Sequence, residues 1–451
     1  MDARKDEGDE IAIQMRALTR QIFLEALAEC SVAKAFAKNL ECHREVLRIC
    51  DDLYDLRSFN RVLAITFGKA ARPMAEGLIA AIGAAAQGIV VEPELGPVAP
   101  LLSGFRHYLG GHPAPNMGSQ AAANAVLKSL GSQAQNALVI FLLSGGGSAM
   151  LEKPLDHEIS LEDLIATHRA LVYCGAPIAE INAVRKHLSS VKGGRLALAA
   201  NDGGAQAQVS VMVSDVPDSS LDALASGPTM PDPTTTDNCY EIAARYKLLP
   251  ELPKAVRELF ERRALEETPK KEDPAFHNCR WWPVLSNRSL EQAAAMAATG
   301  AGFAVEVDNR CDDWDYARAA DYLLKRVREL RKGVSRVCLI SGGEVTVTIP
   351  PETKSGIGGR NQQFALHCVR QIAGENIAVL SAGSDGIDGN SEAAGAAADG
   401  TTLGRAKQLG LDAANSLLGY DSSSFFQKLH DEIVIGPTGN NIRDLRILLA
   451  W

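Results

Sequence analysis

The chain has 451 residues, of which 46 are Lys or Arg and 55 are Asp or Glu, so its formal net charge is −9. This length exceeds what one hydrophobic core usually serves, which predicts two domains. The acidic balance disfavours non-specific binding to nucleic acid, because such binding needs a basic surface. The longest apolar runs are too short to span a bilayer, so no membrane-embedded segment is expected.

The cysteines number nine, an odd count, and include no C-x-x-C pair. Buried free thiols in a reducing compartment are therefore expected, and not a disulfide framework. The first ten residues, MDARKDEGDE, are charged and do not match a secretory signal peptide. We expect a cytoplasmic protein.

The first part of the chain alternates predicted helices and strands. A helix is expected over residues 10–40, followed by a buried strand, RVLAITF, that ends at Gly68 and Lys69. Next comes a helix with Pro73 in its first turns, where proline is tolerated. Further strands are expected at 88–92, 137–143 and 207–213, and further helices at 118–131, 160–173 (capped by Ser160) and 193–200. This alternation predicts a larger, doubly wound, Rossmann-like domain with a parallel sheet covered on both faces.

A change in composition marks the expected domain boundary. Residues 245–280 are highly charged and carry prolines at their ends, which predicts a surface helix and a linker. The expected domains are therefore residues 10–265 and 275–451. In the second, smaller α/β domain, strands are predicted at WPVLS, 303–307, 336–341, 345–349 and 376–383. The short spacer between 336–341 and 345–349 predicts a hairpin, and hence a mixed sheet.

Three predicted strands end in loops of small residues: FLLSGGGSA, CLISGGEVT and VLSAGSDGIDG. Ligands of open α/β sheets bind at the carboxyl ends of strands, and loops of Gly and Ser let backbone N–H groups approach an oxyanion. Together the three loops predict a phosphate-bearing ligand. There is no G-x-x-x-x-G-K-[ST] motif, and GIGGRN has Asn361 where the third glycine of G-x-G-x-x-G belongs. A Walker-type site and a dinucleotide-binding domain are therefore disfavoured.

Two basic segments are candidates for contact with an anion. INAVRKHLSSVKGGRLA contains Asn182, Arg185 and Lys186, and it reads either as a solvated helix surface or as part of a binding site. In KSGIGGRNQQ, Arg360 follows Gly358 and Gly359 at the start of a predicted helix. This position suits bidentate binding of phosphate or carboxylate.

Carboxylates follow two of the predicted strands. Asp215 lies in SDVP, and Asp385 and Asp388 lie in SDGIDG. Such groups beside phosphate loops hold Mg²⁺ or act on an attacking hydroxyl. The alternative for Asp385 and Asp388, a pair of turn aspartates, is equally compatible with their spacing. For His112, in GGHPAPN, a role in orienting a turn is favoured over metal binding.

These motifs together resemble the class II glycerate kinases. The resemblance rests on FGKAA, GGHPAPN, LLSGGGSAML, INAVRKHLSSVKGGRLA, SDVP…ASGPTMPDPTT, GIGGRNQQ, SAGSDGIDGNSEAAGA and GPTGNNIRDL, in family order from about residue 15 to 450. Two departures stand out: Asp218-Ser219-Ser220 follow SDVP where the family tends to have Gly and two acids, and Asn390-Ser391-Glu392 replace Pro-Thr-Asp after DGIDG. They put the geometry of metal binding in doubt, and not the fold.

The resemblance implies a kinase that uses ATP and Mg²⁺ to phosphorylate D-glycerate, usually at the 2-hydroxyl, in a cleft between an N-terminal glycerate-kinase domain and a smaller MOFRL-type domain. Lys69 and Arg360 would neutralise charge on the phosphoryl group or the glycerate carboxylate, and Asp215 and Asp385 would complete the catalytic set. Metal would be held by Asp215, Asp385 and Asp388. Nucleotide binding would involve Ser144, Gly145, Gly146, Gly147, Ser148, Asn182, Arg185, Lys186, Gly358, Gly359 and Asn361.

Two rival functions stay open. Members of this family have been labelled hydroxypyruvate reductases, although the absent dinucleotide motif argues against that activity. A non-catalytic sensor of sugar acids or phosphate is the other alternative, and the presence of Lys69, Arg360 and the three acidic positions argues against it. A homodimer is the assembly considered, and the sequence leaves the oligomeric state open.

Overall fold

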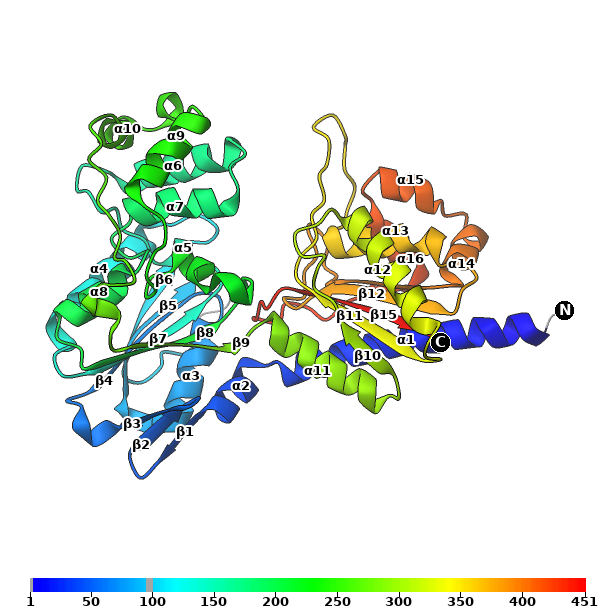
Figure 1. The fold of residues 1–451 in the computed structure, drawn as a ribbon, viewed down its shortest axis with the longest axis horizontal. Coiled ribbons are helices and arrows are strands. Elements are labelled where there is room, and N and C mark those ends of the chain that lie inside the picture. The colour runs from blue at the N-terminus through cyan, green and yellow to red at the C-terminus, as the bar shows by residue number, and fades with distance from the viewer. Residues whose placement is uncertain (1–2, 95–99) are drawn as a thin grey trace. The chain divides into compact units, whose positions relative to one another are not determined.

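The computed structural model describes residues 3–94 and 100–451, which form two compact units (Figure 1). The continuous unit comprises residues 32–284. The discontinuous unit comprises residues 1–31 together with 285–451. The unit boundaries differ from the expected domains in two places, because the first helix groups with the C-terminal residues and residues 266–284 group with the continuous unit.

A six-stranded sheet forms the centre of the continuous unit. Its order is β6-β5-β4-β7-β8-β9, and the pairings β5–β6, β4–β5, β4–β7 and β7–β8 are parallel. Every residue of β4 and β7 is buried, as expected of strands covered on both faces. The bounds are β4 Val62–Phe67, β5 Ala86–Pro93, β6 Phe105–Gly110, β7 Leu138–Ser144, β8 Ala207–Val213 and β9 Cys279–Leu285.

Helices cover this sheet as the alternating sequence predicts. Helices α4 (Met117–Gln133) and α8 (Arg195–Asp202) share one core with residues such as Ile65, Val139 and Phe141. Helix α3 (Ala71–Ile82) contacts β4, β5 and β7 and is joined there by α2 (Val32–Asn39). The predicted Rossmann-like parallel sheet is confirmed. The predicted helix over 10–40 is instead two helices, α1 (Ala3–Glu29) and α2, interrupted at residues 30–31.

A helical layer with its own core lies beyond the sheet. It is built from α6 (Leu161–Tyr173), α7 (Ile178–Leu188), α9 (Thr236–Arg245) and α10 (Lys254–Glu261) (Figure 1). Ser160 caps α6 as predicted, because its side chain accepts the Asp163 N–H at 3.0 Å. The charged segment, expected to be a surface helix and a linker, contains the helix α10, whose Val256 and Phe260 contribute to this core. It then leads into β9, so WPVLS belongs to the first sheet and not to the second.

The discontinuous unit has a mixed sheet, as predicted. Its order is β10-β11-β15-β12-β13-β14; β10–β11 is parallel and the other pairings are antiparallel. The predicted hairpin between 336–341 and 345–349 is wrong, because β11 is paired on one side with β10 and on the other with β15. The bounds are β10 Ala304–Val307, β11 Val337–Gly342, β12 Ile377–Gly383, β13 Gly395–Asp399, β14 Glu432–Ile433 and β15 Asp444–Ala450.

Two groups of helices contact this second sheet. Helix α1 packs against α11 (Asn287–Gly300) and against β12, β13 and β15. Helices α12 (Tyr316–Arg331) and α13 (Arg360–Gln371) contact β11–β13 and β15, and their core includes Phe364, Phe425 and Phe426. Shorter helices complete the unit: α14 Thr402–Gln408, α15 Ala413–Leu418 and α16 Ser422–Leu429.

The remaining short elements lie in the continuous unit. A three-stranded antiparallel sheet, which the sequence reading did not anticipate, follows α2. Its strands are β1 Leu40–His43, β2 Val46–Ile49 and β3 Asp52–Asp55. The other short elements are α5 Gly147–Met150, η1 Leu56–Ser58, η2 Gly83–Ala85, η3 Asp218–Ser226, η4 Leu249–Glu251 and η5 Pro274–Phe276.

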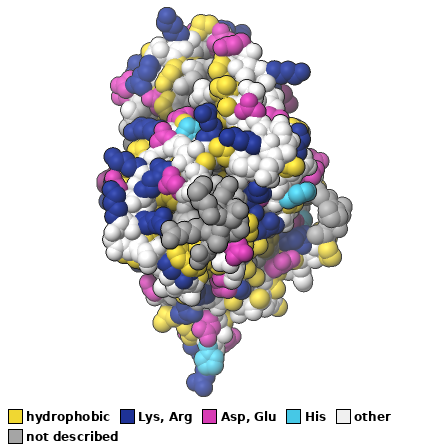
Figure 2. All heavy atoms as spheres, turned by 90° about the vertical axis from the view of Figure 1, so that its right-hand side faces the viewer, with side chains coloured by type: hydrophobic (Ala, Val, Ile, Leu, Met, Phe, Trp, Pro, Cys, Tyr) yellow, Lys and Arg dark blue, Asp and Glu magenta, His cyan; other side chains and the backbone are white. Residues whose placement is uncertain are grey.

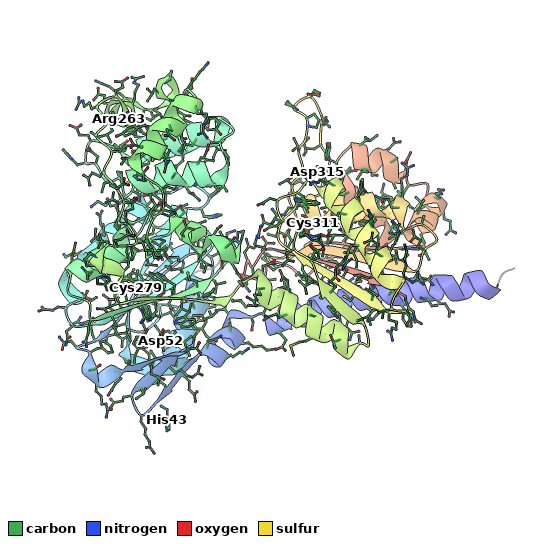
Figure 3. The ribbon with its side chains drawn as sticks, viewed as in Figure 1. His43, Asp52, Arg263, Cys279, Cys311 and Asp315 are labelled. Carbon is green, nitrogen blue, oxygen red and sulfur yellow. The ribbon has the colours of Figure 1, made fainter. Side chains whose placement is uncertain are left out.

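The cysteines are free thiols, as expected. Six of the nine are buried, including Cys279 in β9 and Cys311 before α12, which are labelled in Figure 3. Burial raises the pKa of the Cys279 thiol to about 12 and that of Cys311 to about 11, so both are protonated at neutral pH. Across residues 3–94 and 100–451, none of the helices combines the length and apolar character needed to cross a bilayer.

Candidate functional site

The first group of predicted residues meets at the carboxyl edge of the sheet in the continuous unit. Strands β4, β7 and β8 are neighbours, and their ends are in register, Phe67 with Leu143 and Ser144 with Val213. The loop after β4 lies directly on the loop after β7. Lys69 N donates to Gly145 O at 2.9 Å, and Ala70 N donates to the Ser144 hydroxyl at 3.0 Å. The structure therefore brings Lys69 and the SGGGS loop together.

The three glycines of this loop leave room for neighbouring side chains. A Cβ on Gly145 would lie 2.0 Å from Asp215 Oδ2, so the carboxylate rests on the bare backbone. A Cβ on Gly146, whose φ is +79°, would lie 2.9 Å from His112 Cδ2 and 3.2 Å from Lys69 Cγ. Lys69, His112 and Asp215 thus surround one glycine loop, an arrangement that bulkier residues there would prevent.

His112 is the site residue that the sequence reading assigned only to a turn. It follows β6, at the same carboxyl edge, and is partly buried. Burial lowers the pKa of His112, and the nearby Lys69 ammonium lowers it further. The imidazole is therefore neutral at physiological pH and offers a nitrogen lone pair. The motif GGHPAPN carried this signal, but β6 was not predicted, so nothing placed His112 beside the glycine loop.

Lys186 sits inside the fold and not on a surface. Its ammonium lies 3.0 Å from Asp222 Oδ2 and 3.2 Å from Asp232 Oδ1, and the residue is only 3% exposed. Its charge is thus balanced internally, which argues against the expected contact with a nucleotide. Segment η3 links this pair to the glycine loop, because Asp222 and Ser226 both belong to η3 and Ser226 Oγ lies 2.9 Å from Ser148 Oγ.

Two other predicted residues of α7 are also largely enclosed. Asn182 is 9% exposed, and burial lowers the pKa of Arg185. Arg185 Nε is buried and has no hydrogen-bond partner among the described residues. The adjacent buried pair of Lys192 and Glu152, with Ser189 Oγ donating to Glu152 Oε1 at 2.6 Å, fixes the chain that follows α7. This basic segment is therefore an internal polar network and not the solvated helix surface that the sequence also allowed.

A second group of predicted residues meets in the discontinuous unit around Arg360. Its Nε lies 2.6 Å from Asp444 Oδ2, and its Nη2 lies 2.8 Å from Glu344 Oε1. Burial alone would lower the pKa of Arg360, but the two carboxylates outweigh burial and raise it. Burial raises the pKa of Glu344, against the opposing effect of Arg360. Glu344 follows β11 and Asp444 opens β15, so two glycine-rich loops and the GGRNQ segment meet here.

Asp388 closes the N-terminus of α13. One carboxylate oxygen accepts the Asn361 N–H at 3.0 Å, and the other accepts the Gln362 N–H at 2.8 Å. A Cβ on Gly359 would lie 2.3 Å from Asp388 Oδ1, and one on Gly358 would lie 2.3 Å from Ser422 Oγ. Asn361 is itself buried and bonded to Ser381. Gly359 and Asn361 thus pack around Asp388, and Gly358 packs against Ser422; the nucleotide-binding role that the resemblance implies for these three residues stays a prediction.

The expected metal ligands belong to different units, Asp215 to the continuous unit and Asp385 and Asp388 to the discontinuous unit. No three His, Cys, Asp or Glu side chains in residues 10–94 and 100–451 are placed to hold a metal ion together. Asp388 fits a metal poorly, because both of its oxygens accept backbone N–H groups and burial raises its pKa to about 7. A Cβ on Gly383 would lie 3.1 Å from Asp385 Oδ1 and 3.2 Å from Asp444 Oδ1, which places Asp385 next to the Arg360 group.

Two known protein families match successive parts of this chain. A family described as a domain of unknown function, DUF4147, matches residues 18–261, and the MOFRL family matches residues 337–444. A protein of Pyrococcus horikoshii named glycerate 2-kinase is 36% identical over 347 residues, covering 75% of this chain and 77% of that protein. The chain belongs to the glycerate kinase family.

Structural comparison agrees with this membership. The crystal structure of the glycerate kinase of Thermotoga maritima is 31% identical and has a TM-score of 0.82, covering 97% of this chain and 100% of that one. Another family relative, from Agrobacterium vitis, is named putative hydroxypyruvate reductase; it is 34% identical, with 75% of this chain and 86% of that protein covered. The names of the relatives thus include both a kinase and a reductase.

Proposed function

We propose that this family member transfers the γ-phosphoryl group of ATP to D-glycerate and forms 2-phospho-D-glycerate. The observation that carries the proposal is the arrangement of Lys69, the glycine loop and Asp215 at one carboxyl edge, in a chain related to a protein named glycerate 2-kinase. Phosphoryl transfer asks mainly for positioning and charge stabilisation, and this arrangement offers both. The nine free thiols support a reducing, cytoplasmic location.

Lys69 is proposed to neutralise charge on the transferring phosphoryl group. The residue is exposed, and within the described residues its ammonium has no carboxylate at ion-pairing distance. It is held at the loop by its own backbone bond to Gly145 O. The charge of Lys69 therefore stays available to an anion, unlike that of Lys186. The glycine loop would contribute backbone N–H groups beside it.

Asp215 is proposed to take part in holding Mg²⁺. Mg²⁺ usually binds one or two protein carboxylates and fills its other positions with water and substrate phosphate oxygens, so a single acid at the loop suits it. When bound, Mg²⁺ would offset negative charge on the phosphoryl oxygens. Asp385 remains a second proposed ligand. Asp388 is not proposed as a ligand, because both of its carboxylate oxygens already accept N–H groups at the start of α13.

His112 is proposed to accept the proton of the attacking glycerate hydroxyl. A neutral imidazole at neutral pH is a suitable base, and it lies against the same Gly146 as Lys69. Because the pKa of His112 is lowered, its activity as a base would persist below the pH at which an ordinary histidine becomes protonated.

Arg360 is proposed to orient an anionic group of a substrate, with Asp444 and Glu344 holding its guanidinium in place.

The proposal is tested with an enolase-coupled assay of the purified protein, ATP, Mg²⁺ and D-glycerate, without any phosphoglycerate mutase. Enolase signal in step with ADP release is the expected result, because enolase acts on the 2-phosphate. Lys69→Ala should lower kcat by about 100-fold or more. Lys128→Ala, which removes an exposed lysine from α4, is the matched control and should keep wild-type kinetics. ADP without enolase signal would contradict phosphorylation of the 2-hydroxyl.

Reduction of hydroxypyruvate is the second candidate function, because the Agrobacterium vitis relative carries that name. The same preparation is incubated with hydroxypyruvate and NADH or NADPH, and absorbance at the nicotinamide band is followed. We expect no oxidation, because the chain lacks a G-x-G-x-x-G loop between a strand and a helix. Oxidation that depends on hydroxypyruvate, combined with no ADP release from glycerate and ATP, would replace the kinase proposal.

A further inference from the structure

A pocket of about 240 Å³ opens at the start of α13, entirely within the discontinuous unit. Its lining includes an apolar part, the apolar wall, made of Val347, Ile349 and Tyr420. A second part, the glycine wall, is formed by Ser355, Gly356, Gly358 and Gly359 together with Gly389 and Asn390. Arg360 also lines the pocket, so the pocket and the Arg360 group share this residue.

The glycine wall is held rigidly from both sides. On one side, Gly356 N donates to Gly419 O at 3.0 Å, and Ser423 N donates to Ile357 O at 2.9 Å. On the other side, Gly358 N donates to Asn390 Oδ1 at 2.8 Å. A loop tied at both faces keeps its shape when no ligand is present, which is the preorganisation that binding sites require.

One polar group of the pocket lacks a partner. The Ser422 side chain is 0% exposed and lines the pocket, and its hydroxyl has no hydrogen-bond partner among the described residues. Leaving a buried hydroxyl unpaired costs free energy, which a ligand with a donor or acceptor at that point would recover. Tyr420 has a φ of +49°, as residues that follow a helix end often do, and its hydroxyl donates to Thr348 O at 3.2 Å.

The size and charge of the pocket limit what it can hold. Sites that enclose a whole drug-sized ligand measure roughly 300–1,000 Å³, so about 240 Å³ suits one ring system and not a complete nucleoside triphosphate. Arg360 is the one charged residue in the described lining, and Asp444 and Glu344 fix its guanidinium, so an anionic group would be oriented beside Arg360 while the rest of the pocket holds an uncharged group. The apolar wall and the tyrosine ring suit a flat, uncharged heteroaromatic ring.

We infer that this pocket holds the purine base of the nucleotide substrate, stacked near Tyr420 and hydrogen-bonded to Ser422, with the phosphates leaving past Arg360. The identity of the ligand as a nucleotide rests on the proposed kinase function. The location of its base rests on the pocket alone. The inference assigns nucleotide recognition to the discontinuous unit through uncharged contacts, in place of the basic segment around Lys186.

The test is calorimetric titration of the full chain with ADP and with adenosine, followed by ATP-dependent kinetics. Tyr420→Asn removes the ring while keeping a residue that tolerates left-handed backbone, and Tyr420→Phe keeps the ring as its matched control. We expect Tyr420→Asn and Ser422→Ala to weaken the binding of both ligands by about tenfold. The KM for ATP should rise by a similar factor while the KM for D-glycerate stays unchanged. Tyr420→Phe should bind as wild type does.

A fourth variant guards against loss of folding. Ile349 is 42% exposed, so Ile349→Asp should fold normally while placing a charge against the base. The pocket assignment would be overturned if Ile349→Asp and Tyr420→Asn bound ADP with wild-type affinity and had unchanged circular dichroism. It would also be overturned if the wild-type protein bound ADP but not adenosine. A different result would overturn the proposed function but not the pocket assignment: the wild-type protein binds adenosine, these variants do not, and the wild-type protein phosphorylates no glycerate.

Discussion

Gly145 has no room for even one methyl group, because a Cβ there would lie 2.0 Å from Asp215 Oδ2. Gly145→Ala should therefore displace Asp215 and lower kcat by about tenfold or more. The enolase-coupled assay measures kcat, and thermal unfolding measures the stability of the variant. Gly131→Ala is the matched control, because a Cβ at this position in α4 meets nothing within 4 Å. That control should keep full activity and stabilise the protein by about 0.5–1 kcal/mol. Equal activity in both variants would remove Asp215 from the proposed site.

Asp388 should make the stability of the protein fall as pH rises through weakly acidic values. Burial raises its pKa from 3.8 to about 7, against the opposing N–H groups of Gln362 and Asn361. The folded state therefore binds a proton that the unfolded state has released, and the free energy of unfolding falls between about pH 4 and pH 7. Asp388→Asn removes this titration. The loss of unfolding free energy from pH 5 to pH 8, measured with urea, should be smaller in the variant by about 1 kcal/mol or more.

A matched control exists for this pH effect. Asp412 also caps a helix, because it accepts the N–H groups of Ala414 and Asn415 at the start of α15, but its side chain is exposed. Asp412→Asn should leave the pH dependence of wild type unchanged. A pH dependence in Asp388→Asn that matches wild type would show that the carboxylate is not titrating in this range.

Part of the candidate site could be predicted from residue patterns alone. Lys69, the SGGGS loop and Asp215 follow neighbouring buried strands, so the rule for parallel sheets placed them at one edge. The partners of Arg360 could not be found this way, because Glu344 was assigned to a hairpin and Asp444 opens a strand that had not been predicted. The capping role of Asp388 also depends on a contact between distant segments, which local spacing does not reveal.

At the scale of elements, α1 is held to the discontinuous unit by a buried charge network. Arg16 Nη1 lies 2.9 Å from Asp399 Oδ2 and 3.2 Å from Asp431 Oδ1, and both carboxylates are almost fully buried. The contact with Asp399 is mainly electrostatic, because its geometry lies outside that of a hydrogen bond. Arg16→Ala would leave buried negative charge and should lower the free energy of unfolding by about 2–4 kcal/mol.

Urea denaturation of two variants checks this value. Arg20→Ala, on the same helix, is the control, because Arg20 is exposed and makes only a 3.5 Å bond to Glu432 O. The control should change stability by less than about 0.5 kcal/mol. A similar small effect for Arg16→Ala would mean that Arg405, which also pairs with Asp431, carries this network without α1.

The elements were predictable wherever burial pattern and period agreed. Strands β4 and β7 are almost continuous apolar runs, and α4, α6 and α8 lie within a few residues of their expected bounds. The hairpin failed for a reason that local sequence does not contain, since β15 arrives from the C-terminus to occupy the edge of β11 that the hairpin needed. The small sheet of β1–β3 was not predicted, because each of its strands has only four residues and so shows little periodicity.

At the scale of the whole molecule, one unit is inserted in the other, since residues 32–284 lie between two segments of the discontinuous unit. A fragment of residues 32–284 should therefore fold alone, while residues 285–451 should not, because their sheet lacks α1 on one face. Adding residues 1–31 as a separate peptide should restore cooperative unfolding to the second fragment. Limited proteolysis and amide exchange of the three preparations provide the measurement, and a stable fragment 285–451 without the peptide would contradict the prediction.

This nesting also sets an order for synthesis in the cell. Helix α1 leaves the ribosome before the continuous unit and well before its partners β12, β13 and β15, which lie about 350–420 residues further along the chain. At roughly 5–20 residues per second, the apolar side chains of α1, such as Met15, Ile22 and Phe23, wait on the order of 20–80 s for these strands. The continuous unit can finish folding during that interval. The nascent chain therefore carries an exposed helix beside a completed domain, and this helix is the segment on which chaperones would act.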